Sequence, residues 1–280
     1  MAMNNVSFGQ YYPANSPIHR LDPRAKVVGA IAYIVAAFLC KNMLAFALLL
    51  ASAFVLIMIA RIPVRIVMKS IRALFLILAF TAILNIFWVV DESAQPLFEW
   101  KFITVYAKGF YHAAYIVVRI LCMVIGTSIF LTYTTSPIAL TDAIESLLYP
   151  LTLLKINVHT FAMMMTIALR FIPTIMEETE KIMAAQKARG ADFTTGSLAK
   201  RARALVPIIV PLFASAFRRA DELATAMECR CYHGGKGRTK LRVLRFRVRD
   251  AVALFLIGLL ITGVVLINIY CAQYGWTRTM

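Results

Sequence analysis

The chain has 280 residues, of which 61% are hydrophobic and 16% charged, whereas soluble domains average about half apolar and about a quarter charged. Its formal net charge of +16 at pH 7 would suit a nucleic-acid-binding protein, but no soluble fold of that kind could carry the long apolar segments between the basic clusters. The composition therefore excludes an ordinary soluble domain. It predicts a polytopic, all-α protein whose partner is a lipid bilayer and not a nucleic acid.

Five segments are apolar over about the 20 residues that a helix needs to cross a membrane. They are 27–40, 43–60, 71–90, 106–131 and 251–271, of which the first is short and must include residues before it. The polar residues 1–20 lack the charged-then-apolar order of a cleaved signal peptide. We therefore expect the first helix to act as the insertion signal.

The segment 132–250 differs from the rest of the chain. Its apolar runs, 158–169 and 205–217, lie among prolines and dense charge and are too short to cross a membrane alone. Amphipathic interfacial helices fit this pattern better. We expect three of them, near residues 137–150, 158–189 and 200–230. The predicted domains are 1–131 with four membrane helices, 132–250 with the interfacial helices, and 251–280 with the last membrane helix and a short external tail.

The distribution of Lys and Arg predicts the orientation in the membrane. Arg20, Arg24 and Lys26 precede the first predicted helix, and a second basic cluster at 61–72 separates the second helix from the third. Between 177 and 250 there are sixteen Lys or Arg against eight Asp or Glu. Because basic loops stay in the cytoplasm, we expect a multi-pass protein of the cell membrane, with its N-terminus and the interfacial segment in the cytoplasm.

A weak internal repeat lies within the interfacial segment. One copy begins at Pro173, followed by acidic residues that suit the first turn of a helix, and stops at Gly190; the second begins near Pro211. Arg189 and Arg230 occupy matching places near the two predicted helix C-termini. Each arginine lies between small residues, and the two triplets are Ala188, Arg189 and Gly190, and Cys229, Arg230 and Cys231.

These triplets have two explanations. Small neighbours would let a partner approach the backbone while the guanidinium binds a carboxylate, an interaction that contributes about 1.5–3 kcal/mol. A single arginine at a helix C-terminus would more simply complement the helix dipole. Two copies favour the first explanation, with two similar sockets on a pair of related partners.

Five short segments along the chain match the pattern of one known family. They are Leu21-Asp-Pro-Arg-Ala-Lys26, Ala168-Leu-Arg-Phe-Ile-Pro173, Ala188-Arg-Gly190, Arg219-Ala-Asp-Glu-Leu-Ala-Thr-Ala-Met227 and Tyr232-His-Gly-Gly-Lys-Gly-Arg-Thr239. In this order they resemble the transmembrane T component of energy-coupling factor transporters, in its shared, vitamin-type group. The resemblance runs nearly from one end of the chain to the other.

The resemblance implies a non-catalytic subunit that joins two ABC-type ATPases to a small substrate-binding membrane subunit during ATP-driven uptake of vitamins or related micronutrients. It implies that Arg189 and Arg230 each engage one ATPase. ATP and Mg would be bound by the ATPases, and this chain would have no catalytic residues and bind no cofactor or metal. The family pattern at the second triplet is Ala-Arg-Gly, whereas Cys229 and Cys231 flank the arginine here.

Three other features have rival explanations. Cys229, Cys231 and His233 alternate as metal ligands could, but a fourth ligand is missing and the spacing matches no common zinc motif. The glycine-rich residues 234–239 lack the spacing of a phosphate loop. Arg119, in the fourth predicted helix, is costly in lipid. It either faces a substrate pathway or fastens helices together, with Asn85 as a candidate partner.

Two other classes of membrane protein predict different sequences. A self-contained secondary transporter, the alternative function, should show repeated halves with broken helices near the midplane of the membrane. A membrane enzyme should show a nucleophile, an acid–base pair or a metal cluster. The repeat found here is interfacial, and the sequence assembles no such catalytic set. We therefore expect a coupling subunit.

Overall fold

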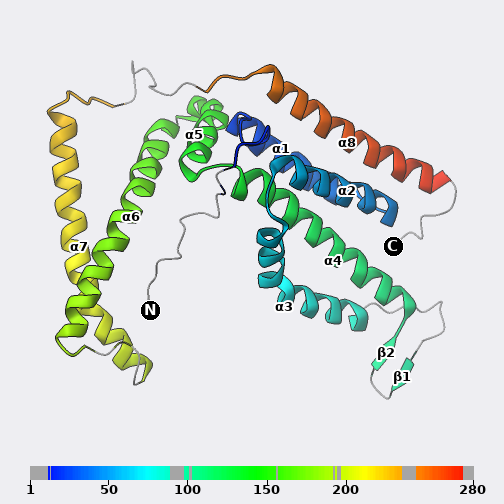
Figure 1. Cartoon of the computed structure of the whole chain (residues 1–280), viewed down its shortest axis with the longest axis horizontal. Coiled ribbons are helices and arrows are strands. Elements are labelled where there is room, and N and C mark those ends of the chain that lie inside the picture. Colours follow the sequence, from blue (N-terminus) through cyan, green and yellow to red (C-terminus); the bar gives the residue numbers. More distant parts are fainter. Residues whose placement is uncertain are drawn as a thin grey trace. The chain divides into compact units, whose positions relative to one another are not determined.

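The computed structural model describes residues 12, 14–88, 98–100, 103–155, 157–191, 193, 197–234 and 244–273. Nearly all of them are helical (Figure 1). The elements are α1 (Pro23–Leu39), α2 (Met43–Ala60), α3 (Val64–Trp88), β1 (Phe98–Trp100), β2 (Ile103–Val105), α4 (Ala107–Thr127), the π-helical η1 (Ser128–Tyr133), α5 (Pro137–Leu147), the 3-10 helix η2 (Tyr149–Leu154), α6 (Val158–Ala188), α7 (Leu198–Glu228) and α8 (Val248–Gln273). The predicted all-α class is confirmed, with one short antiparallel hairpin of β1 and β2 added.

The chain forms two compact units. Unit 1 comprises Met1–Ala143 and Leu244–Met280, and unit 2 comprises Ile144–Val243. The chain therefore leaves unit 1 once, within α5, and returns once, shortly before α8. The three domains predicted from the sequence rest on membrane topology, which packing does not test, so that division stays a prediction.

In unit 1, one glycine decides how closely α1 and α4 approach each other. Tyr33 of α1 is fully buried, and its hydroxyl donates to the carbonyl of Leu49 in α2 over 3.0 Å. The ring lies against Gly126 of α4, where an added Cβ would overlap the ring carbons. Because interiors are close-packed, this position has no room for any side chain.

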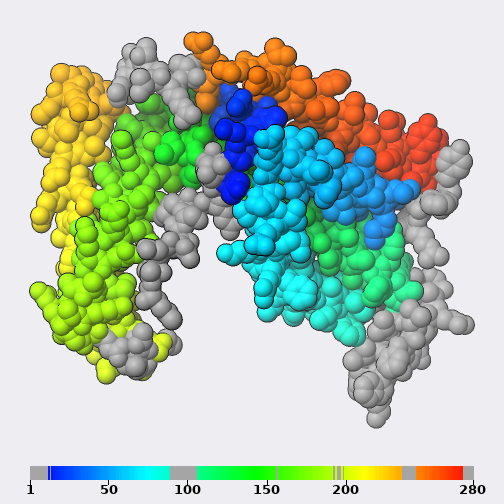
Figure 2. Space-filling view, in the orientation of Figure 1, coloured from blue at the N-terminus to red at the C-terminus, as the bar shows by residue number. Residues whose placement is uncertain are grey.

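The helices of unit 1 expose large apolar side chains on their outer faces. Leu76 of α3 is 77% exposed and Phe255 of α8 is 71% exposed. Figure 2 shows α8, coloured orange to red, with its side chains lying along the surface of unit 1. Apolar surface of this extent is what a protein surrounded by lipid presents.

Among the described residues, five helices are long and apolar enough to cross a membrane: α2, α3, α4 with η1, α6 and α8. The predicted number is confirmed, but one member differs. The predicted span 27–40 corresponds to α1, which has only 17 residues. The fifth candidate is α6, in which the run 158–169 continues without interruption into a helix of 31 residues and so meets the criterion of length and composition. The placement of this helix in the membrane interface stays a prediction.

In unit 2, α6 and α7 pack side by side and run in opposite directions (Figure 1). The helices expected near 158–189 and 200–230 are observed as α6 and α7, but the helix start suggested at Pro173, where the first copy of the repeat begins, is wrong. Pro173 lies inside α6 and Pro211 inside α7. α7 begins instead after Ser197, whose side chain accepts a hydrogen bond from the N–H of Lys200. Proline is tolerated inside membrane-associated helices because neighbouring groups satisfy the freed carbonyls.

Replacing Gly126 with alanine should destabilise the protein by about 1–3 kcal/mol, because the new methyl group overlaps the buried ring of Tyr33. Gly258→Ala in α8 is the matched control, since a Cβ there meets nothing within 4 Å. Thermal unfolding in detergent compares the two variants. Equal midpoints for both would contradict the packing of α1 against α4.

Candidate functional site

The C-terminal end of α6 is closed by two hydrogen bonds that leave Arg189 at the tip. The N–H of Gly190 donates to the carbonyl of Lys187, and the N–H of Ala191 donates to the carbonyl of Gln186, both over 3.0 Å. Gly190 has φ +86°. This pair of bonds, with a left-handed residue between them, is the Schellman motif that commonly ends helices at glycine.

The end of α7 repeats this arrangement without a glycine. The N–H of Cys231 donates to the carbonyl of Glu228 over 2.8 Å, and the N–H of Tyr232 donates to the carbonyl of Met227 over 3.1 Å. Cys231 has φ +53°, in the region that favours glycine. Cysteine thus adopts the conformation that glycine adopts in the first triplet. Arg230 stands at the same place in its motif as Arg189 does in the other.

All six residues of the two triplets are exposed, Ala188, Arg189 and Gly190 at one end and Cys229, Arg230 and Cys231 at the other. The thiols of Cys229 and Cys231 are free. A Cβ added at Gly190 would meet nothing within 4 Å, so the backbone there is open to an approaching surface. Each helix end therefore presents one guanidinium, flanked by small side chains, to the outside of unit 2.

An ion pair joins the middles of α6 and α7. A guanidinium nitrogen of Arg219 lies 2.8 Å from a carboxylate oxygen of Glu178. The pKa of Glu178 is lowered, chiefly by a hydrogen bond from Ser215 and also by Arg219. Glu178 precedes Arg189 by 11 residues, and Arg219 precedes Arg230 by the same 11. Equivalent positions of the two copies therefore meet, as they would at an approximate two-fold axis between antiparallel helices.

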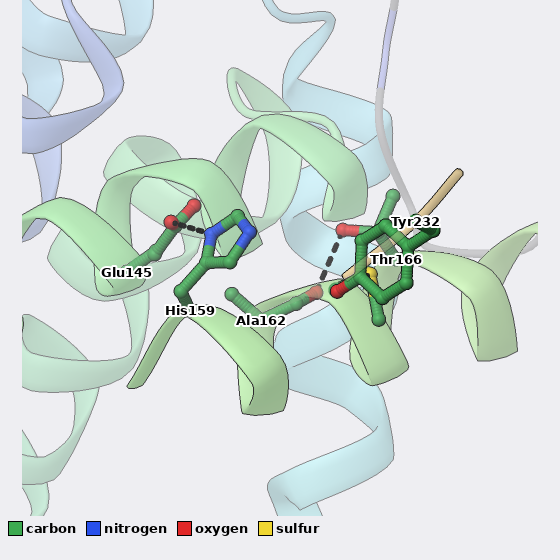
Figure 3. A network of polar contacts seen from close by, with 6 residues as sticks. Glu145, His159, Ala162, Thr166 and Tyr232 are labelled. Carbon is green, nitrogen blue, oxygen red and sulfur yellow. Dashed lines mark hydrogen bonds and ion pairs between the residues drawn. The ribbon is translucent and has the colours of Figure 1, made fainter. Parts of the chain in front are cut away.

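The far end of α7 is attached near the start of α6. The hydroxyl of Tyr232 donates to the sulfur of Met163 over 3.2 Å. Nearby, Nδ1 of His159 lies 2.9 Å from Oε1 of Glu145, which ties the end of α5 to the first turn of α6. Figure 3 shows these residues with Thr166, whose hydroxyl donates to the carbonyl of Ala162. Arg230 therefore lies near the beginning of α6, whereas Arg189 lies at its end.

The two arginines are consequently far apart. Met163 and Arg189 are 26 residues apart in the sequence, which corresponds to about 40 Å along a helix at about 1.5 Å per residue. The sequence repeat predicted two equivalent arginines. It did not predict that they lie at opposite ends of one helix pair, although the shared offset of Glu178 and Arg219 was present in the sequence as a signal.

Arg119 in unit 1 binds the turn between α1 and α2. Its guanidinium donates to the carbonyl of Cys40 over 3.4 Å and to the hydroxyl of Tyr115, and it lies 4.6 Å from the centre of the Tyr115 ring. Tyr115 donates to the same carbonyl of Cys40 over 2.6 Å. Asn85 is not its partner there: the amide of Asn85 donates to Thr81, and its oxygen lies 3.3 Å from Nδ1 of His112. Both residues make polar contacts with their surroundings, but not with each other.

α8 completes the hydrogen bonds of the same turn. The side-chain amide of Asn268 donates to the carbonyl of Leu39 over 2.6 Å, and its oxygen accepts from the N–H of Lys41 over 3.2 Å. Backbone groups outside helices are costly in lipid unless the protein satisfies them. The backbone carbonyl of Cys40 in this turn is therefore a structural partner for the charged guanidinium of Arg119.

The sequence disfavours a metal site at Cys229, Cys231 and His233, because a fourth ligand is missing. In the part of the chain that the structure describes, no group of three His, Cys, Asp or Glu side chains is placed to hold a metal ion. The glycine-rich residues 234–239 lie, beyond Gly234, outside the described residues.

Comparisons with known proteins give a consistent result over most of the chain. Residues 14–241 match the CbiQ family, described as cobalt transport protein. The energy-coupling factor transporter transmembrane protein EcfT of Clostridium kluyveri is 47% identical over 251 residues, which cover 90% of this chain and 92% of that protein. The proteins of the same name from Thermosediminibacter oceani and Bacillus subtilis are 46% and 44% identical, over 93% and 89% of this chain and 97% and 92% of their own lengths.

Cys231→Gly should stabilise the end of α7 by about 1 kcal/mol, because glycine adopts positive φ without the steric cost that a Cβ imposes. Cys229→Gly is the matched control, since Cys229 has the helical φ of −61°, where glycine gives no such gain. Thermal unfolding of the two variants in detergent measures the difference. If Cys231→Gly is no more stable than Cys229→Gly, the left-handed conformation of Cys231 is wrong.

Proposed function

The chain belongs to the family of the energy-coupling factor transporter transmembrane protein EcfT, and from this premise we propose that it joins two ABC-type ATPase subunits to a small substrate-binding membrane subunit. It is a multi-pass membrane protein and a component of such a transporter, not a self-contained transporter. The finer assignments, which concern its partners, its orientation and its cargo, are proposals that rest on the following observations.

The proposal rests mainly on the positions of Arg189 and Arg230. They end the two helices of one antiparallel pair, with the same hydrogen bonds and the same exposure, about 33 Å apart, since each lies 11 residues beyond the contact of Glu178 with Arg219. A single socket cannot receive both at that distance. Two similar partner subunits offer two related sockets, one for each end of the helix pair.

Each arginine end is suited to an acidic groove. The exposed small residues beside Arg189 and Arg230 let a partner surface come close to the backbone. A guanidinium placed there can bind a carboxylate with two parallel hydrogen bonds. Such a charge-assisted bond contributes about 1.5–3 kcal/mol. We propose that each ATPase supplies one acidic residue to one arginine.

The contact between Glu178 and Arg219 explains how motion at the two ends could be combined. It joins α6 and α7 at equivalent positions, so a displacement of one helix end acts on the other helix at that point. When ATP draws the two ATPases together, both arginine ends move. The helix pair then transmits this motion to the membrane helices and the substrate-binding subunit.

The orientation of the chain in the membrane and the cargo of the transporter are proposals as well. Because Lys and Arg are concentrated before α1, between α2 and α3 and throughout 177–250, we propose that these regions and both arginine ends face the cytoplasm. ATP and Mg are then bound by the ATPases, and this chain holds no cofactor. From the resemblance of the sequence to the shared, vitamin-type group, we propose that the cargo is a vitamin or related micronutrient, which the substrate-binding subunit recognises.

Charge reversal at both arginines should abolish ATPase binding. We expect wild type to co-purify with its organism's ATPase pair, Arg189→Glu and Arg230→Glu to retain one ATPase each, and the double variant to retain none. Arg218→Glu is the matched control, because it reverses an exposed charge in the middle of α7, away from both ends. Native mass spectrometry of the purified complexes gives the stoichiometry.

Two outcomes would go against this proposal. If the double variant binds both ATPases as wild type does, the arginines only complement the helix dipoles. If wild type binds no ATPase under conditions in which membrane insertion is normal, the coupling function itself is wrong.

The native cysteines provide a second test, of both orientation and docking. Cys229 and Cys231 are exposed, Cys271 near the end of α8 is half-buried, and Cys40 and Cys122 are buried. A membrane-impermeant maleimide should label Cys229 and Cys231 from the cytoplasmic side and Cys271 from the outside. Bound ATPases should slow labelling at the first two thiols and leave Cys271 unchanged. Labelling of Cys229 and Cys231 from outside would contradict the orientation.

A further inference from the structure

Among the described residues of unit 1, three charged side chains are buried that the proposed partner contacts do not use. Asp22 is 7% exposed, and Lys26 and Asp250 are 2% exposed each. Buried charges are retained only where other groups compensate them. The sequence indicates Lys26 as a charge that orients the chain in the membrane and as part of the segment 21–26 that carries the family resemblance, and this buried cluster is additional to both.

Asp250 binds two segments that are far apart in the chain. Its Oδ1 accepts a hydrogen bond from the N–H of Asp22, and its Oδ2 accepts one from the N–H of Arg247, both over 2.7 Å. Asp22 stands directly before α1, and Arg247 directly before α8. One carboxylate therefore joins the beginnings of the first and last helices.

Lys26 joins the same place to the end of η1. Its ammonium donates to the carbonyl of Thr134 over 2.6 Å and to the carbonyl of His19 over 3.2 Å. Burial lowers the pKa of Lys26 to about 8, and the nearby carboxylates of Asp250 and Asp22 partly oppose this shift. We refer to Asp22, Lys26, Thr134 and Asp250 as the clasp.

The segment before α1 adds further bonds around the clasp. The N–H of Tyr12 donates to the carbonyl of Tyr133 over 3.0 Å, and Nε2 of His19 lies 2.9 Å from the carbonyl oxygen of Tyr12. The hydroxyl of Tyr133 in turn lies 2.7 Å from the hydroxyl of Ser70 in α3. The clasp region thus connects α1, α3, η1 and α8.

The clasp lies where the chain leaves unit 1 and where it returns. Thr134 precedes α5, within which the chain passes into unit 2, by three residues, and Asp250 follows the return at Leu244 by six. Both connections to unit 2 therefore start from residues that Lys26 and Asp250 hold together. A unit joined through two connections moves its neighbour as one body only if the two attachment points are fixed to each other.

We propose that the clasp is the anchor through which motion of unit 2 reaches the membrane helices, with Lys26 and Asp250 as its positioning residues. This inference rests on the proposed coupling function. The clasp keeps the end of η1 and the start of α8 at a fixed separation, so a displacement of unit 2 moves α4 and α8 together. Without the clasp, the same displacement is absorbed by the two connections.

The test compares uptake with ATP hydrolysis in the same proteoliposomes. Wild type, Asp250→Asn and Lys26→Met are each reconstituted with the partner ATPases and a riboflavin-binding subunit, and labelled riboflavin is the probe. Arg20→Ala is the matched control, since it removes an exposed charge from the same N-terminal segment. We expect assembly and ATP hydrolysis to persist in the clasp variants while riboflavin taken up per ATP falls about 5-fold or more, the scale of a typical coupling energy.

An insertion keeps the test decisive where a clasp variant fails to assemble. Two glycines placed between the exposed residues Arg245 and Phe246 leave every clasp residue in place but loosen the return connection. Uptake per ATP should fall in this variant as well. An unchanged ratio in the insertion variant, or in assembled Asp250→Asn, would overturn the proposal. If wild type itself shows no ATP-driven uptake, the proposed function fails first, and the clasp proposal with it.

Discussion

Backbone N–H and carbonyl groups must find partners within the protein wherever water is scarce, and this constraint accounts for most of the polar side chains described above. At the turn between α1 and α2, Arg119, Tyr115 and Asn268 supply those partners. At the start of α8, Asp250 supplies them. A charge in such a place stabilises the fold through the backbone it satisfies, and it needs no substrate to explain it.

The same requirement shapes the ends of α6 and α7. Each closes its last turn with backbone hydrogen bonds of its own, so the arginine side chain is not needed to cap the helix. Arg189 and Arg230 can therefore extend outward and bind a partner. The contact between Glu178 and Arg219 sets the register of the two helices. The pair is half-buried, and its main consequence is that the two copies of the repeat meet at equivalent positions.

The sequence predicted those parts of the protein that depend on local pattern. Apolar runs of sufficient length predicted most of the membrane helices, and the repeat predicted two matching arginines. The sequence did not predict the features that depend on contacts between distant segments of the chain. The charges of Lys26 and Asp250 look like those of any loop until the fold brings residues more than 100 positions apart into contact. The helix expected over 158–189 is observed as α6, but the repeat made Pro173 look like a helix start, because a sequence does not show directly that a helix continues through a proline.

The central claim is that the two arginine ends are far apart and are moved by two ATPases. Its most direct measurement is the distance between spin labels at Lys187 and Glu228, which are exposed equivalent positions beside the two arginines. The measurement is made in the assembled transporter, with the reactive native cysteines replaced. The account predicts a separation of about 30 Å, because each labelled position lies 9 residues beyond the contact of Glu178 with Arg219 on its own helix. Labels that lie close together would contradict it.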